Sequence, residues 1–315
     1  MATSGSIDFS VSRDDIITEA LEQMGVLAEG QSPSSDQLTS MSRTLNMLVK
    51  ALQGDGLNLF ALQKLYVYLE KNKNEYSLSS TTTDHFSSEY NRTTTSAVSS
   101  STDTTITVTS ISNMVSGDYI GIKLDDGTMQ WTTINGTPSG STVTLTDALT
   151  DDVSSGVTVY FYTSKANRPM KISNSMITNS IDNNDTPIWT MSRQEYIELP
   201  NKTNDGSTNQ IYYDPQVGTG KLFVWPETDS VDKYLTLWVQ RTLEDFDAAN
   251  DDADFPQEWY LTLSFNLAAL SCTKYGVPRF ERSYIREMAM MYLDLARSFD
   301  IEDGFQLQPE NNPYG

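Results

Sequence analysis

The chain has 315 residues and carries 42 acidic against 21 basic side chains, a formal net charge of −21. Tight binding of a phosphate backbone needs clustered Lys and Arg, so this charge argues against a protein that wraps DNA. One cysteine, Cys272, and one histidine, His85, exclude a disulfide scaffold and argue against a zinc site. We expect Cys272 to be a small buried residue, His85 to lie on the surface, and the chain to need no metal or cofactor.

The length is sufficient for one large domain or two ordinary domains without covalent cross-links. The sequence does not open with a secretory signal, and no apolar run approaches the ~18 residues that span a membrane. We therefore expect a protein that is made in the cytoplasm and has no membrane partner.

Two helices are predicted near the N-terminus. Ser12 and Asp15 form a capping-box pair at the start of the first helix, which Gly25 ends. The second helix is predicted to be capped by Ser32 and to end at Gly54. Its apolar residues recur at steps of three and four and predict a helix-bundle seam: Leu38, Met41, Leu45, Leu48 and Leu52.

The middle of the chain is predicted to be rich in β-structure. From Leu65 apolar and polar residues alternate, and the turn KNKN predicts a hairpin with the following EYSLS. The Ser/Thr-rich stretch 77–110 predicts weak, exposed strands, and the short strands after it predict an antiparallel sandwich or small barrel. Residues 221–225 and 234–239 are expected to pair as another hairpin.

Two further helices are predicted towards the C-terminus. The first lies between Pro256 and Gly276 and carries an apolar stripe at helical spacing: Trp259, Leu263, Leu267 and Leu270. The second is predicted from Arg279 to Phe299 and should pack antiparallel on the first. One of its faces carries Tyr284, Met288, Met291 and Leu295. Residues 301–315 show no periodicity and are expected to form an extended tail.

Segments at both ends of the chain resemble the head-to-tail adaptor proteins of short-tailed bacteriophages, also described as packaged-DNA stabilisation or tail tubular proteins. These segments are RDDIITEALEQMGV, LNMLVKALQGDGLNLF, DFPQEW and NLAALSCTKYGVP. In the β-rich middle, RPMKI, RQEYIELPNKT, IYYDPQ and GKLFVWPE resemble the larger members of the family. The resemblance implies a virion protein of the tail or neck without catalytic activity. It also implies a ring, usually of twelve copies, that sits beneath the portal and prolongs the DNA channel.

The resemblance further implies an α+β fold in which N- and C-terminal helices form one bundle with a large inserted antiparallel β-region. The expected parts are 1–74, the inserted 75–246, 247–300 and a docking tail at 301–315. Expected partners are the portal protein and the next tail component, a nozzle or tail tube protein; tail fibres are a further candidate. DNA is expected to pass through the ring without tight binding. The tail would anchor on the portal through Phe305, Leu307, Pro309 and Tyr314.

A different function stays open, a glycan- or receptor-binding β-module of a phage tail or surface protein. In that case exposed Trp131, Trp225 and Tyr213 would stack on sugar rings. Enzymatic activity is not expected, because His85 is the one histidine and neither a GxSxG elbow nor a phosphate-binding GxxxxGK[ST] loop is present. The acidic run 244–254 lacks EF-hand spacing and is expected to be a solvated linker rather than a calcium site.

Overall fold

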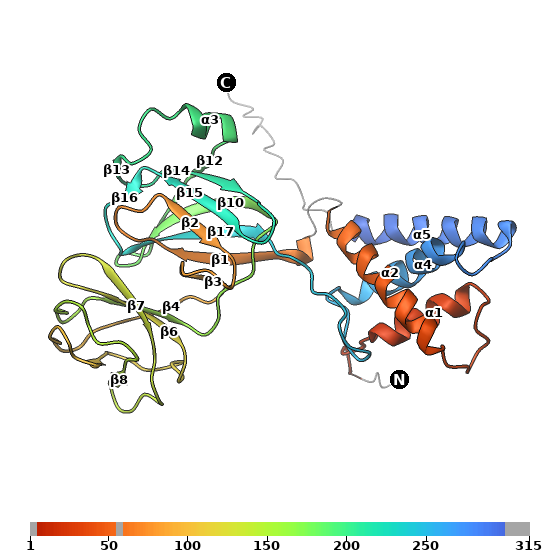
Figure 1. Ribbon diagram of the computed structural model, residues 1–315, viewed down its shortest axis with the longest axis horizontal. Helices are drawn as coiled ribbons and strands as arrows, with labels where there is room; N and C mark the ends of the chain where they lie inside the picture. Colours follow the sequence, from red (N-terminus) through yellow and green to blue (C-terminus); the bar gives the residue numbers. More distant parts are fainter. Residues whose placement is uncertain (1–4, 55–58, 300–315) are drawn as a thin grey trace, which may run out of the picture. The chain divides into compact units, whose positions relative to one another are not determined.

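The computed structural model describes residues 5–54 and 59–299, and the chain divides into two compact units (Figure 1). The helical unit combines residues 1–61 with 243–315, and the β unit comprises residues 62–242. The fold class is α+β, as predicted. The divisions fall at 61/62 and 242/243 rather than at 74/75 and 246/247, because β1 (Leu62–Tyr68) pairs along its length with β17 (Lys233–Gln240).

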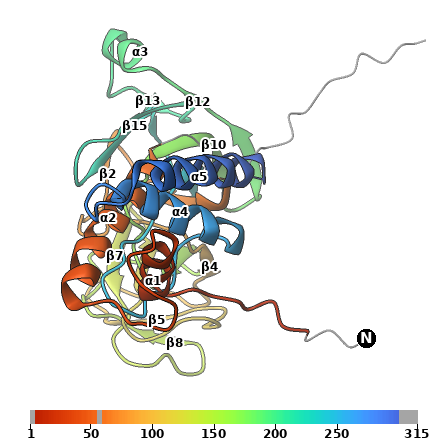
Figure 2. The same cartoon turned by 90° about the vertical axis from the view of Figure 1, so that its right-hand side faces the viewer.

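The helical unit consists of α1 (Arg13–Gln23), α2 (Ser35–Gln53), α4 (Tyr260–Ser271) and α5 (Arg279–Phe299), with 3-10 turns η1 (Leu59–Ala61) and η2 (Gln257–Trp259). α1, α2 and α5 all pack against α4 (Figure 2). The hydroxyl of Thr262 donates to the Tyr292 carbonyl at 3.0 Å, and the amide of Asn266 donates to the Ala289 carbonyl at 3.3 Å. This order of contacts makes α4 and α5 antiparallel, as the short connection between them predicts.

Local capping signals fix where the helices begin. At α1 the predicted capping box is present, since the Asp15 amide donates to Ser12 Oγ and the Ser12 amide donates to the Asp15 carboxylate. The predicted cap of α2 is wrong: Ser34 caps it instead of Ser32. Ser34 is followed three residues later by Gln37, whose side-chain oxygen accepts from the Ser34 amide at 2.8 Å, and Ser32 has no such residue at that spacing.

One apolar core fills the helical unit. It contains buried residues of all four helices together with Leu243, Phe246 and Phe255 from the segment that precedes α4. Phe60, Phe255 and Trp259 form an aromatic group with ring centroids 5.4–5.6 Å apart. Cys272 is buried in this core, as expected. Residues separated by about two hundred positions in the chain therefore share one desolvated cluster, and each fully buried large side chain contributes ~1.5–3 kcal/mol.

The main part of the β unit is a sandwich of two sheets (Figure 1). One sheet has the order β11-β10-β17-β1-β3 and the other the order β12-β14-β15-β2. Apolar residues from the facing strands form a shared core that includes Leu65, Leu78, Leu222 and Leu235. Besides β1 and β17, the strands of the sandwich are β2 (Glu75–Leu78), β3 (Phe86–Ser87), β10 (Lys171–Asn179), β11 (Asn184–Pro187), β12 (Trp189–Thr190), β14 (Gln210–Asp214) and β15 (Gly220–Trp225).

Both hairpins predicted from sequence are wrong. β1 pairs with β17 and β3, whereas β2 pairs with β15, so the KNKN turn connects one sheet to the other. Likewise β15 pairs with β14 and β2, and β17 pairs with β1 and β10. Alternation along a strand shows which side chains face a core but does not select the neighbouring strand. In each case the strands lie on opposite sides of the shared core rather than side by side.

A smaller sheet, separate from the sandwich, is formed by the part of the chain between β3 and β10. It has the order β4-β9-β6-β7, and β5 pairs with β8 beside it. The strands are β4 (Asn91–Thr94), β5 (Thr105–Thr107), β6 (Tyr119–Lys123), β7 (Met129–Thr133), β8 (Thr142–Thr144) and β9 (Thr158–Tyr162). A separate aliphatic core supports these strands. The predicted β-region is thus a two-sheet sandwich and a smaller sheet with separate cores, and it is mostly antiparallel, with β12 and β14 paired in parallel.

Aromatic side chains connect the sandwich to the smaller sheet. The buried tyrosines of this cluster are Tyr68, Tyr160, Tyr162 and Tyr234, with Tyr66, Tyr90, Tyr119 and Trp131 packed around them. His85 packs against this cluster and is half-buried, so it is less exposed than predicted. Its ring stacks on Trp131 at 3.9 Å, and its Nδ1 lies 2.7 Å from Tyr162 Oη. Burial, with the nearby Lys165 and Lys73, lowers the pKa of His85 to about 3.

The remaining elements of the β unit are short. α3 (Arg193–Glu198) begins at a Ser192–Glu195 capping box, and β13 (Asp205–Gly206) pairs in parallel with β16 (Glu227–Thr228). Among the helices described for residues 5–54 and 59–299, none has the length and apolar character needed to cross a membrane.

Candidate functional site

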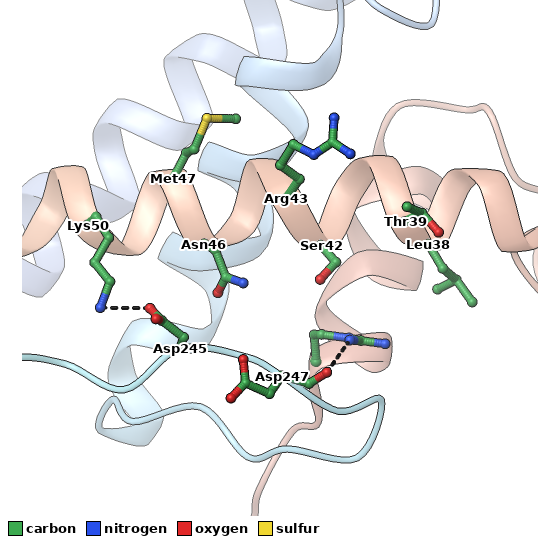
Figure 3. Close-up of a pocket in the computed structure, with 10 residues that line it drawn as sticks. Leu38, Thr39, Ser42, Arg43, Asn46, Met47, Lys50, Asp245 and Asp247 are labelled. Atoms are coloured by element: carbon green, nitrogen blue, oxygen red, sulfur yellow. Dashed lines mark hydrogen bonds and ion pairs between the residues drawn. The ribbon is translucent and has the colours of Figure 1, made fainter.

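A hollow on the helical unit lies between α2 and the acidic segment 243–251 (Figure 3). This α2 groove has a volume of about 770 Å³. Its lining is mostly polar: Arg13, Leu38, Thr39, Ser42, Arg43, Asn46, Met47, Lys50, Asp245 and Asp247. Four of these residues lie on α2 at the spacing of one helix face, Thr39, Ser42, Asn46 and Lys50. The groove therefore exists because a polar face of α2 runs beside an acidic loop.

Side chains of α2 hold the acidic segment in place. Asn46 accepts from the Phe246 amide at 2.9 Å and donates to the Phe246 carbonyl at 3.2 Å. Lys50 donates to the Leu243 carbonyl at 2.7 Å and forms an ion pair with Asp245 at 2.7 Å (Figure 3). The paired hydrogen bonds of Asn46 satisfy backbone groups beside the buried Phe246 side chain. The sequence patterns did not predict this role. A polar Asn between the seam positions Leu45 and Leu48 could have indicated a side chain that hydrogen-bonds at the edge of the core.

Some charges of the α2 groove are paired: Lys50 pairs with Asp245 inside it, and Arg13 pairs with Asp14 at its edge. Arg13 pairs with Asp14 at 2.8 Å and donates to the Asp247 carbonyl at 3.4 Å. Arg43 is exposed and forms no ion pair within the described part of the chain. The residues of the groove serve to fix the segment that leads into α4.

Two carboxylates of the acidic run 244–254 accept hydrogen bonds from backbone amides of the same run. Asp251 accepts from the amides of Asp247 and Ala248 at 2.7 and 2.5 Å, and Asp254 accepts from the Glu244 amide at 3.1 Å. Within residues 5–54 and 59–299, no group of three or more His, Cys, Asp or Glu side chains is arranged to hold a metal ion. Asp251 and Asp254 therefore act as caps of this loop.

Most predicted seam residues of α2 and α4 lie in the core of the helical unit. The buried ones are Met41, Leu45, Leu48, Leu52, Trp259, Leu263 and Leu267. Leu38 is partly buried against the same core, and Met288 is half-buried. Helices from the two ends of the chain thus contact through the residues that the three-and-four spacing selected.

Three residues of the predicted interface face solvent: Leu270, Met291 and Leu295 are 54%, 49% and 52% exposed. On α5 the buried residues are instead Ile285, Ala289 and Ala296. These residues form the row adjacent to the predicted one, and their smaller side chains let α5 approach α4 closely. Sequence alone does not separate two adjacent apolar rows, since both have helical spacing.

The four predicted portal-docking residues, Phe305, Leu307, Pro309 and Tyr314, lie outside the described residues. The aromatic residues predicted to bind sugar do not form exposed platforms. Trp131 lies in the aromatic cluster, Trp225 donates to the Asn201 carbonyl at 2.8 Å, and Tyr213 Oη donates to the Pro169 carbonyl at 2.5 Å. Burial raises the pKa of Tyr213 to about 12.

A different tryptophan is open to solvent. Trp189 on β12 is 78% exposed and borders a hollow of about 500 Å³. Its neighbours there are Thr190, Met191, Glu195, Leu199 and Gln210. Backbone bonds fix its position, because the Trp189 amide donates to the Asn209 carbonyl at 3.0 Å. The backbone of Trp189 is therefore held in place, and its indole ring is open to solvent beside both polar and apolar side chains.

Comparisons with known proteins add little to this picture. No protein-family model matches the chain, and no curated protein matches it. Among solved structures, the chain is similar to VP17, a capsid protein of bacteriophage P23-77, with 12% identity over 57% of this chain and 71% of that one. The TM-score of 0.12 is too low to indicate a shared fold, so this likeness carries no conclusion about function.

Proposed function

We propose that this chain is a structural protein of a phage virion and acts as a ring-forming head-to-tail adaptor without catalytic activity. Its ring would join the portal to the next tail component and prolong the DNA channel. The proposal is carried by one observation: α1 and α2 from the start of the chain share a core with α4 and α5 from its end. This is the arrangement that the resemblance of the two chain ends implies.

The way the β unit is inserted supports the same proposal. Leu62 and Gln240 are paired partners in neighbouring strands, so the chain enters and leaves the β unit at adjacent points. An insertion with close ends leaves the core of its host intact. The net charge of −21 also suits a channel wall, since basic walls would hold DNA by counterion release.

The test of this function is co-assembly with the portal protein of the same phage. Native mass spectrometry of the 35.2 kDa chain mixed with that portal is expected to give a joint complex with many copies of the chain. A variant lacking residues 305–315 is expected to keep its circular dichroism spectrum and to lose the complex. Absence of a joint complex with the full-length chain contradicts the adaptor function.

A second function, glycan binding by the β unit, is favoured by one specific observation, the exposed Trp189 beside a polar hollow. A flat aromatic face next to amide and carboxylate groups is a common way to hold a sugar ring. Glycan-array binding that Trp189→Ala removes and Trp225→Ala retains would support this function. An array without signal for the wild-type chain would dispose of it.

A further inference from the structure

A second groove on the helical unit lies between α1, α4 and the segment that precedes α1. This α1 groove has a volume of about 450 Å³, and its apolar walls are formed by Phe9, Val11, Ile16, Tyr260 and Leu261. Phe9 is 66% exposed and Leu261 is 48% exposed, so the walls are open to solvent. A concave apolar surface of this size is typical of a site that receives large side chains of a ligand.

The outer wall of the α1 groove is anchored to the rest of the helical unit. The Gln257 side chain donates to the Ile7 carbonyl at 2.9 Å. The Phe9 and Tyr260 rings pack with their centroids 5.9 Å apart. Because this wall is already ordered, a ligand would lose less conformational entropy here than at a surface that forms only on binding.

The buried polar residue of the groove lining, Ser264, already has hydrogen-bond partners. Its hydroxyl donates to the Leu261 carbonyl at 3.1 Å and accepts from the Gln23 amide at 3.3 Å. An apolar side chain that enters the groove therefore leaves this hydroxyl satisfied. The interior of the α1 groove thus favours an apolar anchor.

Carboxylates surround these apolar walls. Asp15 and Glu19 lie one turn apart on the same face of α1, and both are exposed and line the groove. Asp252 and Glu258 are exposed near Tyr260, and burial together with these two carboxylates raises the pKa of the Tyr260 hydroxyl. None of the four carboxylates forms an ion pair with a described residue, and no lysine or arginine is among the described residues of the lining. The α1 groove therefore has an uncompensated negative rim.

The candidate occupants within the chain itself have the wrong charge for this rim. An exposed apolar row on α5 includes Tyr284 and Met291, but the exposed charged residues on that side of the helix are Glu287 and Asp294. Residues 300–315 contain four acidic side chains and no basic one. Either segment would bring carboxylates against carboxylates, which disfavours binding. The charge of the rim instead favours a basic segment.

We propose that the α1 groove binds a basic amphipathic segment of a different protein, in which lysine or arginine flanks large apolar side chains. The apolar side chains pack between Phe9 and Leu261, and the cationic groups lie against Asp15 and Glu19. An amphipathic helix in an apolar groove is a common mode of peptide recognition. The net charge of −21 favours the same partner, because it speeds the approach of a basic surface. This site depends on neither the ring nor the portal.

Three synthetic peptides of ~14 residues, about four helical turns, test both requirements. The first carries leucine and phenylalanine on one helix face and lysine on the other. The second has glutamate in place of each lysine, and the third keeps each lysine but has serine in place of the apolar residues. Fluorescence anisotropy with the full chain is expected to give the first peptide a dissociation constant about tenfold or more below those of the other two. Equal binding of the first and third overturns the site, because net charge alone then explains the binding.

Variants of the chain locate the bound peptide. Leu261→Ser removes an apolar wall and should raise the dissociation constant of the first peptide about tenfold, as expected for one buried leucine contact. Glu19→Lys should weaken the first peptide and strengthen the second. Glu287→Lys makes the same charge change on α5, outside the groove, and should leave both affinities within about twofold because salt screens distant charges. Met47→Ser removes an exposed apolar residue of α2 and is the control for Leu261→Ser.

Hydrogen exchange with the first peptide bound is expected to show new protection in residues 7–19 and 257–264. Protection confined to the hollow beside Trp189 or to the α2 groove overturns the site, as does an equal effect of Glu287→Lys and Glu19→Lys. If the wild type self-associates in sedimentation velocity and Phe9→Ser abolishes this, the occupant is a second copy and the proposed partner is wrong. Circular dichroism checks each variant, and Glu19→Lys, at an exposed position, decides the result if Leu261→Ser unfolds.

Discussion

The helical unit and the β unit differ in how they treat large apolar side chains. Among the described residues, sixteen such side chains are exposed, and only six belong to the β unit: Val98, Val115, Ile181, Trp189, Ile197 and Val217. The other ten lie in the helical unit, although it is the smaller of the two, and four of them align on α5. Most of the exposed large apolar side chains of the described residues therefore lie in the helical unit.

The units also differ in how polar groups are used. The helical unit has one apolar core, and polar side chains such as Asn46 fix a loop at its edge. The β unit has two apolar cores joined by a cluster of tyrosines and by an ion pair between the half-buried Lys123 and the buried Asp232. A joint that contains hydroxyl groups and charges depends on every partner being present, so it responds to pH and to single polar changes more than an aliphatic core does.

Leu267→Ala should give the largest loss of stability in the helical unit. Leu267 is fully buried on α4, and removing a buried leucine side chain costs about 2–5 kcal/mol. Hydrogen exchange is expected to show faster opening of α1, α2 and α4 with unchanged protection in the β unit. Leu270→Ala, on the same helix but half-exposed, is the control and should cost less than ~1 kcal/mol. Equal losses for both would mean that α4 faces the core differently.

Asp232→Ala should be the most damaging polar change in the β unit. The Asp232 carboxylate is buried and accepts from Lys123 Nζ at 2.5 Å and from Thr158 Oγ1 at 2.8 Å. Removing it leaves two donors without a partner, at about 2–4 kcal/mol. Urea unfolding followed by aromatic circular dichroism measures the loss. Asp229→Ala breaks an exposed pair with Lys233 and should change stability by ~1 kcal/mol or less.

His85 should make the β unit sensitive to acid. Its pKa is about 3 in the folded chain against 6.5 when unfolded, so the unfolded state binds the extra proton between these values. Stability is therefore complete above pH 6.5 and falls as the pH drops towards 3, by about 2 kcal/mol at pH 5. His85→Gln should remove this part of the pH dependence when unfolding is compared at pH 7 and pH 5. An unchanged slope would show that carboxylates dominate the acid response.

Asn46→Ala should have the smallest effect of the four, about 1–2 kcal/mol, because it leaves one amide and one carbonyl of Phe246 without a partner. Hydrogen exchange should locate the change in residues 243–251. Ser42→Ala, which lines the same groove, is the matched control and should leave that segment protected. If Asn46→Ala also leaves it protected, the buried Phe246 side chain alone holds the segment.

Particular residues show how far the sequence could predict this fold. The capping box at Ser12 and the length of α5 were readable because each depends on groups within a few positions along the chain. The burial of Leu263 and Leu267 was readable because helical spacing selects one face. The role of Asn46 in the α2 groove was harder to predict, because its partner Phe246 lies two hundred residues away and no local pattern reveals it.

The sequence by itself determined the α+β composition, most helix ends, the strand-rich middle and the acidic surface, since these follow from local spacing, capping and charge. Only the tertiary structure decided which strands pair, which row of α5 is buried, and that His85 lies among tyrosines. These features depend on how much apolar surface each alternative pairing would bury, and that depends on the whole chain. The packing that leaves Phe280 and Tyr284 in solvent is of this second kind, because a side chain is exposed only after every other element has taken its place.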